Sequence, residues 1–203
     1  MGATSSAPVW LASVQAAAPD TVGAWRALGN AFAGLNGLRR VLKEHVTDGD
    51  APRLLAEQEI LASALEEALV ETPDGALRVP GGEEDWNVAQ TFAHVTAARR
   101  FLPTWAAMAA AGNWPVEDPP TVRPSIPGDP AATREDLLVL LTKSRRSQER
   151  AAEQLTGHET EPCPLDHPLV GRLRCGDWLL FAGVHDLMHL EQLHRIADLY
   201  RGS

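Results

Sequence analysis

The sequence predicts an all-α protein, a four-helix bundle with an additional N-terminal helix. Apolar residues recur at three- and four-residue steps over five long segments, which is the period of an amphipathic helix. Segments rich in glycine and proline separate these helices, and the alternation that predicts a strand is almost absent. With 203 residues, 44% of them hydrophobic, the chain can bury the core of one domain.

The first predicted helix belongs to an N-terminal extension over residues 20–47. Residues 1–19 are mostly small and polar, so we expect them to form a flexible N-terminal arm. Either Asp20 or Thr21 can cap the helix that follows, and the turn-forming segment TDGDAP ends it after about His45. The apolar side chains of this helix are Val22, Trp25, Leu28, Phe32, Leu35, Leu38 and Leu42.

Four further helices are expected to form the core of a single domain over residues 20–203. Pro52 suits the start of the first of them, and Asp85 can cap the second. Pro103 is expected to kink the second helix or to end it early. The predicted spans are 52–71, 86–111, 131–155 and a last helix that opens at Gly176 or Asp177 and runs to about 199.

Two long loops are predicted around the third helix of this core. Residues 112–130 hold six prolines, a density that excludes both a helix and a central strand. Residues 156–176 contain a candidate extended piece at 165–174, but they lack the alternation of a strand. Long loops in a compact domain are often functional, so both are candidates for lining a cleft.

Composition and charge exclude several classes of function. The net charge of −9 would repel nucleic acid and anionic membranes, and no apolar run is long enough for a membrane span. The N-terminus lacks the features of a signal peptide. Cys163 and Cys175 do not have the CxxC spacing of a metal-binding pair, and we expect both to be reduced thiols. These features predict a cytoplasmic protein that binds neither nucleic acid nor membranes.

The stretch HDLMHLEQLH, residues 185–194, holds three of the seven histidines. His185 and His189 are four residues apart, so on a helix both imidazoles lie on one face within reach of one cation. That face is apolar, and a buried imidazole needs a hydrogen bond, a carboxylate or a metal. His94, near the apolar stripe of an earlier helix, is the natural third ligand. Three imidazoles from two helices form a metal site with open positions for water or substrate.

The other four histidines are weaker candidates for metal ligands. His45 ends a helix, where a cation suits the helix dipole, and His158 and His167 lie in loops. His194 is nine residues after His185 and about 180° around the helix from it, so it should face away. We expect these four side chains to be structural or solvated.

The segment HDLMH is similar to the HExxH motif of zinc peptidases, with Asp186 at the position of the glutamate. Asp is one methylene shorter and would not reach a metal-bound water in the usual way. The third ligand of those peptidases lies downstream, where only His194 is available, on the wrong face. The sequence therefore argues against a peptidase, and we interpret Asp186 as a surface residue or as a partner of a neighbouring imidazole.

Two segments resemble the DinB-like superfamily. DWNVAQTFAHVTAARRFL is similar to its second helix, in which a Trp opens the helix and a His follows. DHPLVGRLRCGDWLLFAGVHDLMHLEQLHRI is similar to its closing segment, with a His-Pro loop, a Gly turn, Trp-Leu and then HxxxHxxQ. The resemblance covers about residues 53–199 and leaves the first helix as an extension of the DinB-like four-helix bundle.

The resemblance implies a metal site and a class of reaction. Carried over by position, the ligands are His94, His185 and His189, and the metal is Zn, Ni, Mn or Fe. Members of the superfamily are up-down-down-up bundles and are often dimeric, so a homodimer is expected. Characterised bacterial members include bacillithiol S-transferases and a mycothiol-dependent maleylpyruvate isomerase, which implies a small-molecule thiol and an electrophile as substrates.

We therefore expect a metal-dependent low-molecular-weight-thiol S-transferase or isomerase in detoxification or stress response. Coordination by a cation depresses the pKa of a thiol and supplies thiolate at neutral pH. Two alternatives stay open. One is a non-catalytic metal-binding protein of the stress response that works through protein contacts, and the other is a metal-free bundle whose histidines only form hydrogen bonds. The sequence distinguishes neither the metal nor the thiol.

Overall fold

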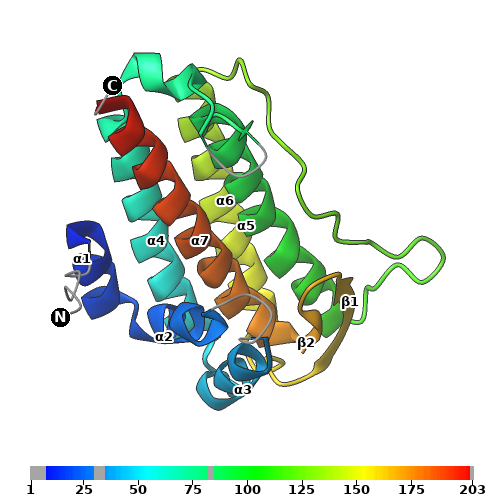
Figure 1. Ribbon diagram of the computed structural model, residues 1–203. Helices are drawn as coiled ribbons and strands as arrows, with labels where there is room; N and C mark the ends of the chain where they lie inside the picture. Colours follow the sequence, from blue (N-terminus) through cyan, green and yellow to red (C-terminus); the bar gives the residue numbers. More distant parts are fainter. Residues whose placement is uncertain (1–7, 30–34, 82–84, 202–203) are drawn as a thin grey trace.

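The computed structural model describes residues 8–29, 35–81 and 85–201, and four long helices form its centre (Figure 1). The predicted all-α bundle is confirmed, but within the described residues three helices precede it instead of one, and one small hairpin is added. No helix within these ranges is both long enough and apolar enough to cross a membrane. The four core helices are α4 (Ala51–Glu71), α5 (Val88–Ala110), α6 (Arg134–Leu155) and α7 (Cys175–Arg201).

The connections between these helices set their order around the bundle. α5 and α4 each pack against both α6 and α7, so α4 and α5 lie diagonally across from one another. A short connection with the 3-10 helix η1 (Asp74–Arg78) reverses the chain between α4 and α5. Residues 111–133 carry no helix or strand and run back along the bundle, so α6 points the same way as α5 (Figure 1). The arrangement is up-down-down-up.

Capping residues explain why two of these helices start later than the periodicity predicts. Asn87 accepts a hydrogen bond from the backbone of Gln90 at 2.9 Å, and the Gln90 side chain accepts one from the backbone of Asn87. Thr133 and Asp136 form the same capping box at the start of α6. Pro103 lies inside α5 and does not end it early, because the helix continues to Ala110.

The predicted single helix over residues 20–45 is wrong. The chain forms two helices there, α2 (Pro19–Leu28) and α3 (Leu35–His45). Gly29 has φ +48°, a conformation that favours glycine and ends α2. Phe32, assigned to the same helix by its spacing, lies outside the described residues.

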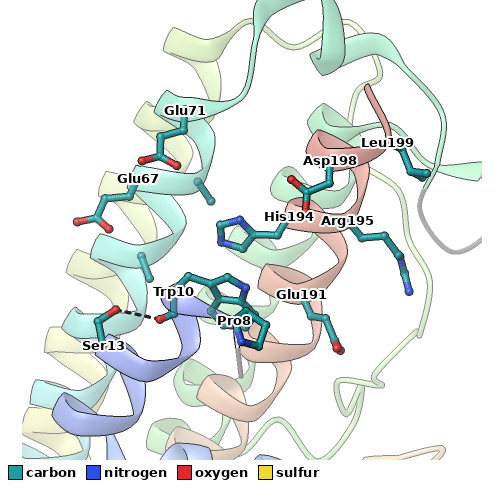
Figure 2. A pocket seen from close by; sticks show the side chains of 12 residues that line it. Pro8, Trp10, Ser13, Glu67, Glu71, Glu191, His194, Arg195, Asp198 and Leu199 are labelled. Atoms are coloured by element: carbon teal, nitrogen blue, oxygen red, sulfur yellow. Dashed lines mark hydrogen bonds between the residues drawn. The ribbon is translucent and has the colours of Figure 1, made fainter. Parts of the chain in front are cut away.

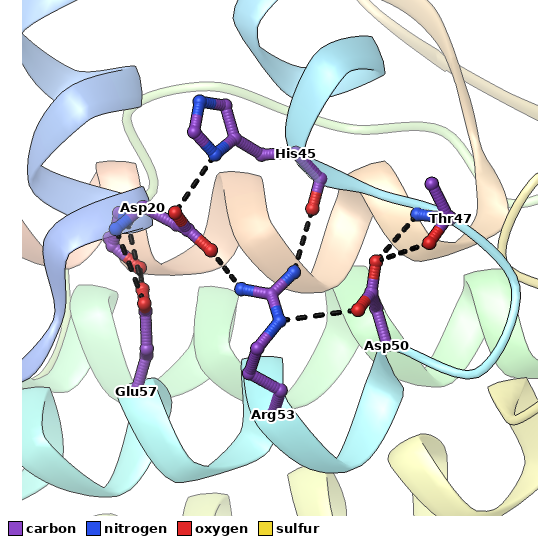
Figure 3. Close-up of polar contacts among 7 residues, drawn as sticks. Asp20, His45, Thr47, Asp50, Arg53 and Glu57 are labelled. Atoms are coloured by element: carbon purple, nitrogen blue, oxygen red, sulfur yellow. Dashed lines mark hydrogen bonds and ion pairs between the residues drawn. The ribbon is translucent and has the colours of Figure 1, made fainter.

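α2 is held at its N-terminus by a side chain from α4 (Figure 3). The Glu57 carboxylate accepts hydrogen bonds from the backbone N–H groups of Asp20 and Thr21, at 3.2 and 2.9 Å, and from the Thr21 hydroxyl at 2.6 Å. Asp20 in turn pairs with His45 and Arg53. Neither expected cap therefore caps α2 itself, because a carboxylate on α4 satisfies the free N–H groups of that helix.

Part of the segment expected to be a flexible arm forms helix α1 (Val9–Ala17). Leu11 and Val14 are buried, and with Ala18 they complete a stripe at three- and four-residue steps that packs against α4. This stripe is not evident from the sequence, where residues 1–19 are mostly small and polar. Residues 1–7 lie outside the described part of the chain.

A two-stranded antiparallel hairpin precedes α7, where the sequence showed no convincing strand. It consists of β1 (Pro162–His167) and β2 (Gly171–Arg174). Arg39 of α3 donates to the Val170 carbonyl at 2.8 Å, so the N-terminal extension covers the hairpin. Cys163 and Cys175 are both buried here as free thiols.

The apolar core consists of two clusters that meet near the middle of the bundle. The hairpin-end cluster includes Val184 of α7 and Leu102 of α5. The far-end cluster includes Leu187 of α7 and Val95 of α5. Polar side chains occupy the level between them on all four helices. We call this set the central polar layer, and its members are Gln58, Arg99, Ser144, Gln148 and Asp186.

Candidate metal centre

Three histidines from two helices come together beside the central polar layer. His94 lies on α5, and His185 and His189 lie on α7. One possible ligand nitrogen from each ring lies within 4.8 Å of the others, and the Nε2 atoms of His94 and His185 are 3.2 Å apart. The structure therefore brings together the three residues that the sequence predicts as ligands. Within the described ranges, no other group of three potential ligands has this geometry.

The local sequence explains why these rings meet. His185 and His189 are one helical turn apart, and their ring centroids are 4.5 Å apart. α5 packs directly against α7 and brings His94 to 5.0 Å from each of them, centroid to centroid. All three side chains are partly buried, so the cluster lies at the edge of the bundle and not in its centre.

His94 is oriented by the long proline-rich loop. Its Nδ1 lies 3.0 Å from the carbonyl oxygen of Ile126, which can only accept, so Nδ1 carries the proton and donates. The lone pair of the neutral ring is then on Nε2, which faces the cluster. The loop lies close to α5 here, since a Cβ on Gly128 would be 2.2 Å from the Cβ of Ala93. One of the two loops expected to line a cleft thus contacts the site.

His189 is oriented by Gln192, the last residue of the HxxxHxxQ pattern. Its Nδ1 lies 2.7 Å from Oε1 of Gln192, and the amide oxygen accepts. This hydrogen bond leaves the Nε2 lone pair of His189 for the cluster. Histidine ligands in metal sites commonly donate their second N–H to a carbonyl or carboxylate in this way.

His185 is the least satisfied member of the cluster. Its Nδ1 is buried and has no hydrogen-bond partner among the described residues. Burial lowers the pKa of His185 well below its ordinary value, and the neighbouring His189 and His94 lower it further. Burial also lowers the pKa of His189 to about 4, against an opposing hydrogen bond from Gln192. Both rings are therefore neutral at pH 7, the form in which imidazole binds a metal.

The donor set fits one divalent cation. Zn–N bonds of about 2.0–2.1 Å at a tetrahedral angle place two ligand nitrogens about 3.3 Å apart. The Nε2 atoms of His94 and His185 are 3.2 Å apart, and in His94 and His189 the hydrogen bond at Nδ1 holds the tautomer whose lone pair is on Nε2. Three imidazoles suit several first-row ions, so this fit does not select one metal.

His194 faces away from the cluster, as its spacing predicts. It stacks on Trp10 of α1, with ring centroids 5.0 Å apart and 12° between the ring planes. Both rings line a groove of about 1050 Å³ between α1, α4 and α7 (Figure 2). His194 takes no part in the candidate metal centre.

The other three histidines have separate partners. His45 pairs with Asp20 at 2.8 Å, and His158 pairs with Glu161 at 2.7 Å. His167 is the last residue of β1, not part of a loop, and its ring lies 5.7 Å from that of Phe181. Its Nδ1 accepts hydrogen bonds from the backbone N–H groups of Leu169 and Val170, so the neutral ring carries its proton on Nε2.

Asp186 is not a surface residue, and that part of its interpretation is wrong. Its side chain is fully buried and pairs with the fully buried Arg99 of α5. Burial raises the pKa of Asp186 to about 7, although Arg99 opposes the shift. The carboxylate is engaged in the central polar layer and is not placed as the base of an HExxH-type peptidase. No bond from it to an imidazole is present among the described residues.

Arg99 was missed by the sequence analysis, although a signal was present. On α5, Phe92, Val95 and Leu102 mark the inward stripe, and Arg99 lies four residues after Val95 on that stripe. A charged residue on an apolar stripe is seldom buried without a partner. The partner, Asp186, lies eighty-seven residues away and could not be identified from spacing.

Comparison with known proteins identifies the family. A family model described as the DinB superfamily matches residues 57–193, which is more than half of the chain. The chain belongs to the DinB superfamily. The matched region of this DinB superfamily protein contains His94, His185 and His189. No curated protein and no solved structure gave a significant match.

Proposed function

We propose that this DinB superfamily protein is a metal-dependent S-transferase or isomerase that uses a low-molecular-weight thiol. The observation that carries the proposal is the convergence of three imidazoles, with Nε2 of His94 3.2 Å from Nε2 of His185. The three residues are partly exposed, which suits a site that takes further ligands from solution, whereas a purely structural site would not need them.

The protein's own residues would hold and orient the metal. His94, His185 and His189 supply three neutral nitrogens, so the full charge of a divalent ion stays available to a bound thiol. That charge lowers the pKa of a coordinated thiol and supplies thiolate at neutral pH. The Ile126 carbonyl and Gln192 hold two of the rings in the required tautomer.

No protein thiol is needed as the nucleophile. Cys163 and Cys175 are buried in the hairpin-end cluster, where neither can reach a substrate without opening the core. A small thiol such as mycothiol or bacillithiol would take the nucleophile's place. In the transferase case, the thiolate forms a C–S bond to the electrophile and the leaving group departs with the bonding electrons. In the isomerase case, the thiolate adds to the substrate, the adduct rearranges, and the C–S bond breaks to return the thiolate.

Turnover measurements test the proposal directly. The protein is loaded with Zn, Ni, Mn or Fe and incubated with mycothiol or bacillithiol and an electrophile such as bromobimane or chlorodinitrobenzene. We expect a rate above the uncatalysed reaction for one thiol, lost in His185→Ala and kept in His194→Ala. Stoichiometric metal binding without turnover for either thiol would instead place the protein in the non-catalytic metal-binding class.

A further inference from the structure

The central polar layer joins all four core helices through one side chain. Arg99 of α5 donates to Ser144 Oγ of α6 at 3.2 Å and to the Gln58 carbonyl of α4 at 3.1 Å. It also donates to Gln148 Oε1 at 2.5 Å and to the Asp186 carboxylate of α7. All five side chains are fully buried. A single guanidinium therefore contacts each of the other three helices.

Stability alone does not explain this layer. Burying a charged pair removes it from water, and well-packed apolar side chains of similar volume often give an equally or more stable core. The layer is also incompletely satisfied, because Asp186 Oδ1 and Gln58 Nε2 have no hydrogen-bond partner among the described residues. A partly satisfied network costs more than an apolar core, so its presence beside the histidine cluster needs another reason.

The layer and the cluster connect the same two helices. Asp186 follows His185 directly on α7, and Arg99 lies five residues after His94 on α5. Helical side chains tilt toward the N-terminus of their helix, so the long Arg99 side chain reaches back toward the level of His94. The apolar side chains on either side of this level hold α5 against α7, but apolar contacts are not directional. The Arg99–Asp186 pair adds a directional contact between the two helices at the level of the cluster.

We propose that Arg99 is the positioning residue of the histidine cluster. Through Asp186 and the other members of the layer, it fixes α5 against α7, so that His94 meets His185 and His189 at the spacing one metal ion requires. This inference rests on the proposed metal site, but it concerns metal affinity and coordination geometry and not turnover.

Two variants separate positioning from stability. The double variant Arg99→Met/Asp186→Leu removes both charges together and leaves an apolar layer. Arg99→Lys keeps the charge but loses the planar fork that reaches three helices. Arg145→Met on α6 is the matched control, since Arg145 pairs with Glu59 and Glu66 away from the layer. Each full-length protein is titrated with Co(II), followed by visible absorption and chelator competition, and unfolded in urea without metal.

We expect the double variant to keep or raise the urea midpoint while its Co(II) affinity falls at least about tenfold and its absorption bands change. Arg99→Lys should lose affinity in the same direction, and Arg145→Met should match the unaltered protein. Unchanged affinity and absorption in either layer variant would overturn the inference. If the double variant does not fold, Arg99→Lys alone decides. Failure of the unaltered protein to bind Co(II) would instead overturn the metal site itself, and this inference with it.

Discussion

The histidine cluster and the central polar layer lie side by side between α5 and α7, but their atoms are satisfied differently. In the cluster, the Nε2 atoms of His94 and His185 face one another, and outward nitrogens of two rings are held by the protein. In the layer, Arg99 directs its donors at acceptors on all three other helices. The cluster is partly exposed and the layer is fully buried.

Two neighbouring residues of α7 illustrate the difference between the cluster and the layer. His185 and Asp186 are adjacent, yet His185 turns toward the edge of the bundle and Asp186 turns into its centre. Ring nitrogens that converge from three histidines on two helices suit one shared external ligand. Charged side chains that pair within the protein indicate a contact that fixes the arrangement of the helices. Position along the chain does not separate these roles, whereas hydrogen-bond partners do.

The largest expected effect comes from removing a ligand. In His189→Ala the cluster retains two imidazoles, and we expect stoichiometric zinc binding to be lost while the fold stays intact, because the ring is only partly buried. Elemental analysis after gel filtration measures the zinc, and circular dichroism checks the fold. Zinc retained at the level of the unaltered protein would remove His189 from the site.

The next effect concerns the layer. Arg99→Ala leaves Asp186 buried without its partner, and we expect the free energy of unfolding to fall by about 3–5 kcal/mol at neutral pH. Urea unfolding of the metal-free protein measures this loss. A loss below about 1 kcal/mol would show that the pair adds little to the scaffold and would weaken the distinction between the two groups.

A smaller effect is expected from the residue that orients His189. Gln192→Leu conserves volume but removes the acceptor for Nδ1, which lies 2.7 Å away. We expect zinc affinity to fall by about 10–100-fold with stoichiometry preserved. Chelator competition measures the affinity, with Glu191→Gln on the neighbouring exposed position as the control. Equal affinities in both variants would mean that the hydrogen bond does not tune the site.

The smallest effect is expected on the opposite face of α7. His194→Ala removes the stack on Trp10, and we expect a loss of about 1 kcal/mol in the free energy of unfolding. Zinc affinity and stoichiometry should not change, because His194 lies in the groove beside α1 (Figure 2). A drop in zinc affinity would contradict the separation of the two faces.

Sequence periodicity predicted the bundle and the His185–His189 pair because both depend on spacing within single helices, whereas the choice of His94 rested on its place near an apolar stripe and on the family resemblance. The i, i+4 pair on α7 and the inward position of His94 are local properties. The division of the N-terminal helix at Gly29 was missed, because one glycine in a continuous apolar stripe does not by itself end a helix. The capping of α2 by Glu57 also depends on a contact between distant residues.

The central polar layer shows the main limit of sequence reasoning at the site. The sequence left Asp186 as either a surface residue or a partner of a neighbouring imidazole, because its side chain is too short for the role of the glutamate in HExxH. Only the packing of α5 against α7 reveals that it meets Arg99. The hairpin before α7 was missed although β1 alternates, with Cys163 and Leu165 buried between exposed residues. Two prolines and the short length of the strand obscure this pattern in the sequence.

The presence of a metal centre is tested by the zinc stoichiometry of the unaltered protein and of His94→Ala. Both proteins are loaded with zinc, freed of excess metal by gel filtration and analysed for metal and protein. We expect about one zinc per chain in the unaltered protein, a higher melting temperature with zinc than without, and neither effect in His94→Ala. Absence of zinc from the unaltered protein, or equal binding by both, would contradict a metal centre built from His94, His185 and His189.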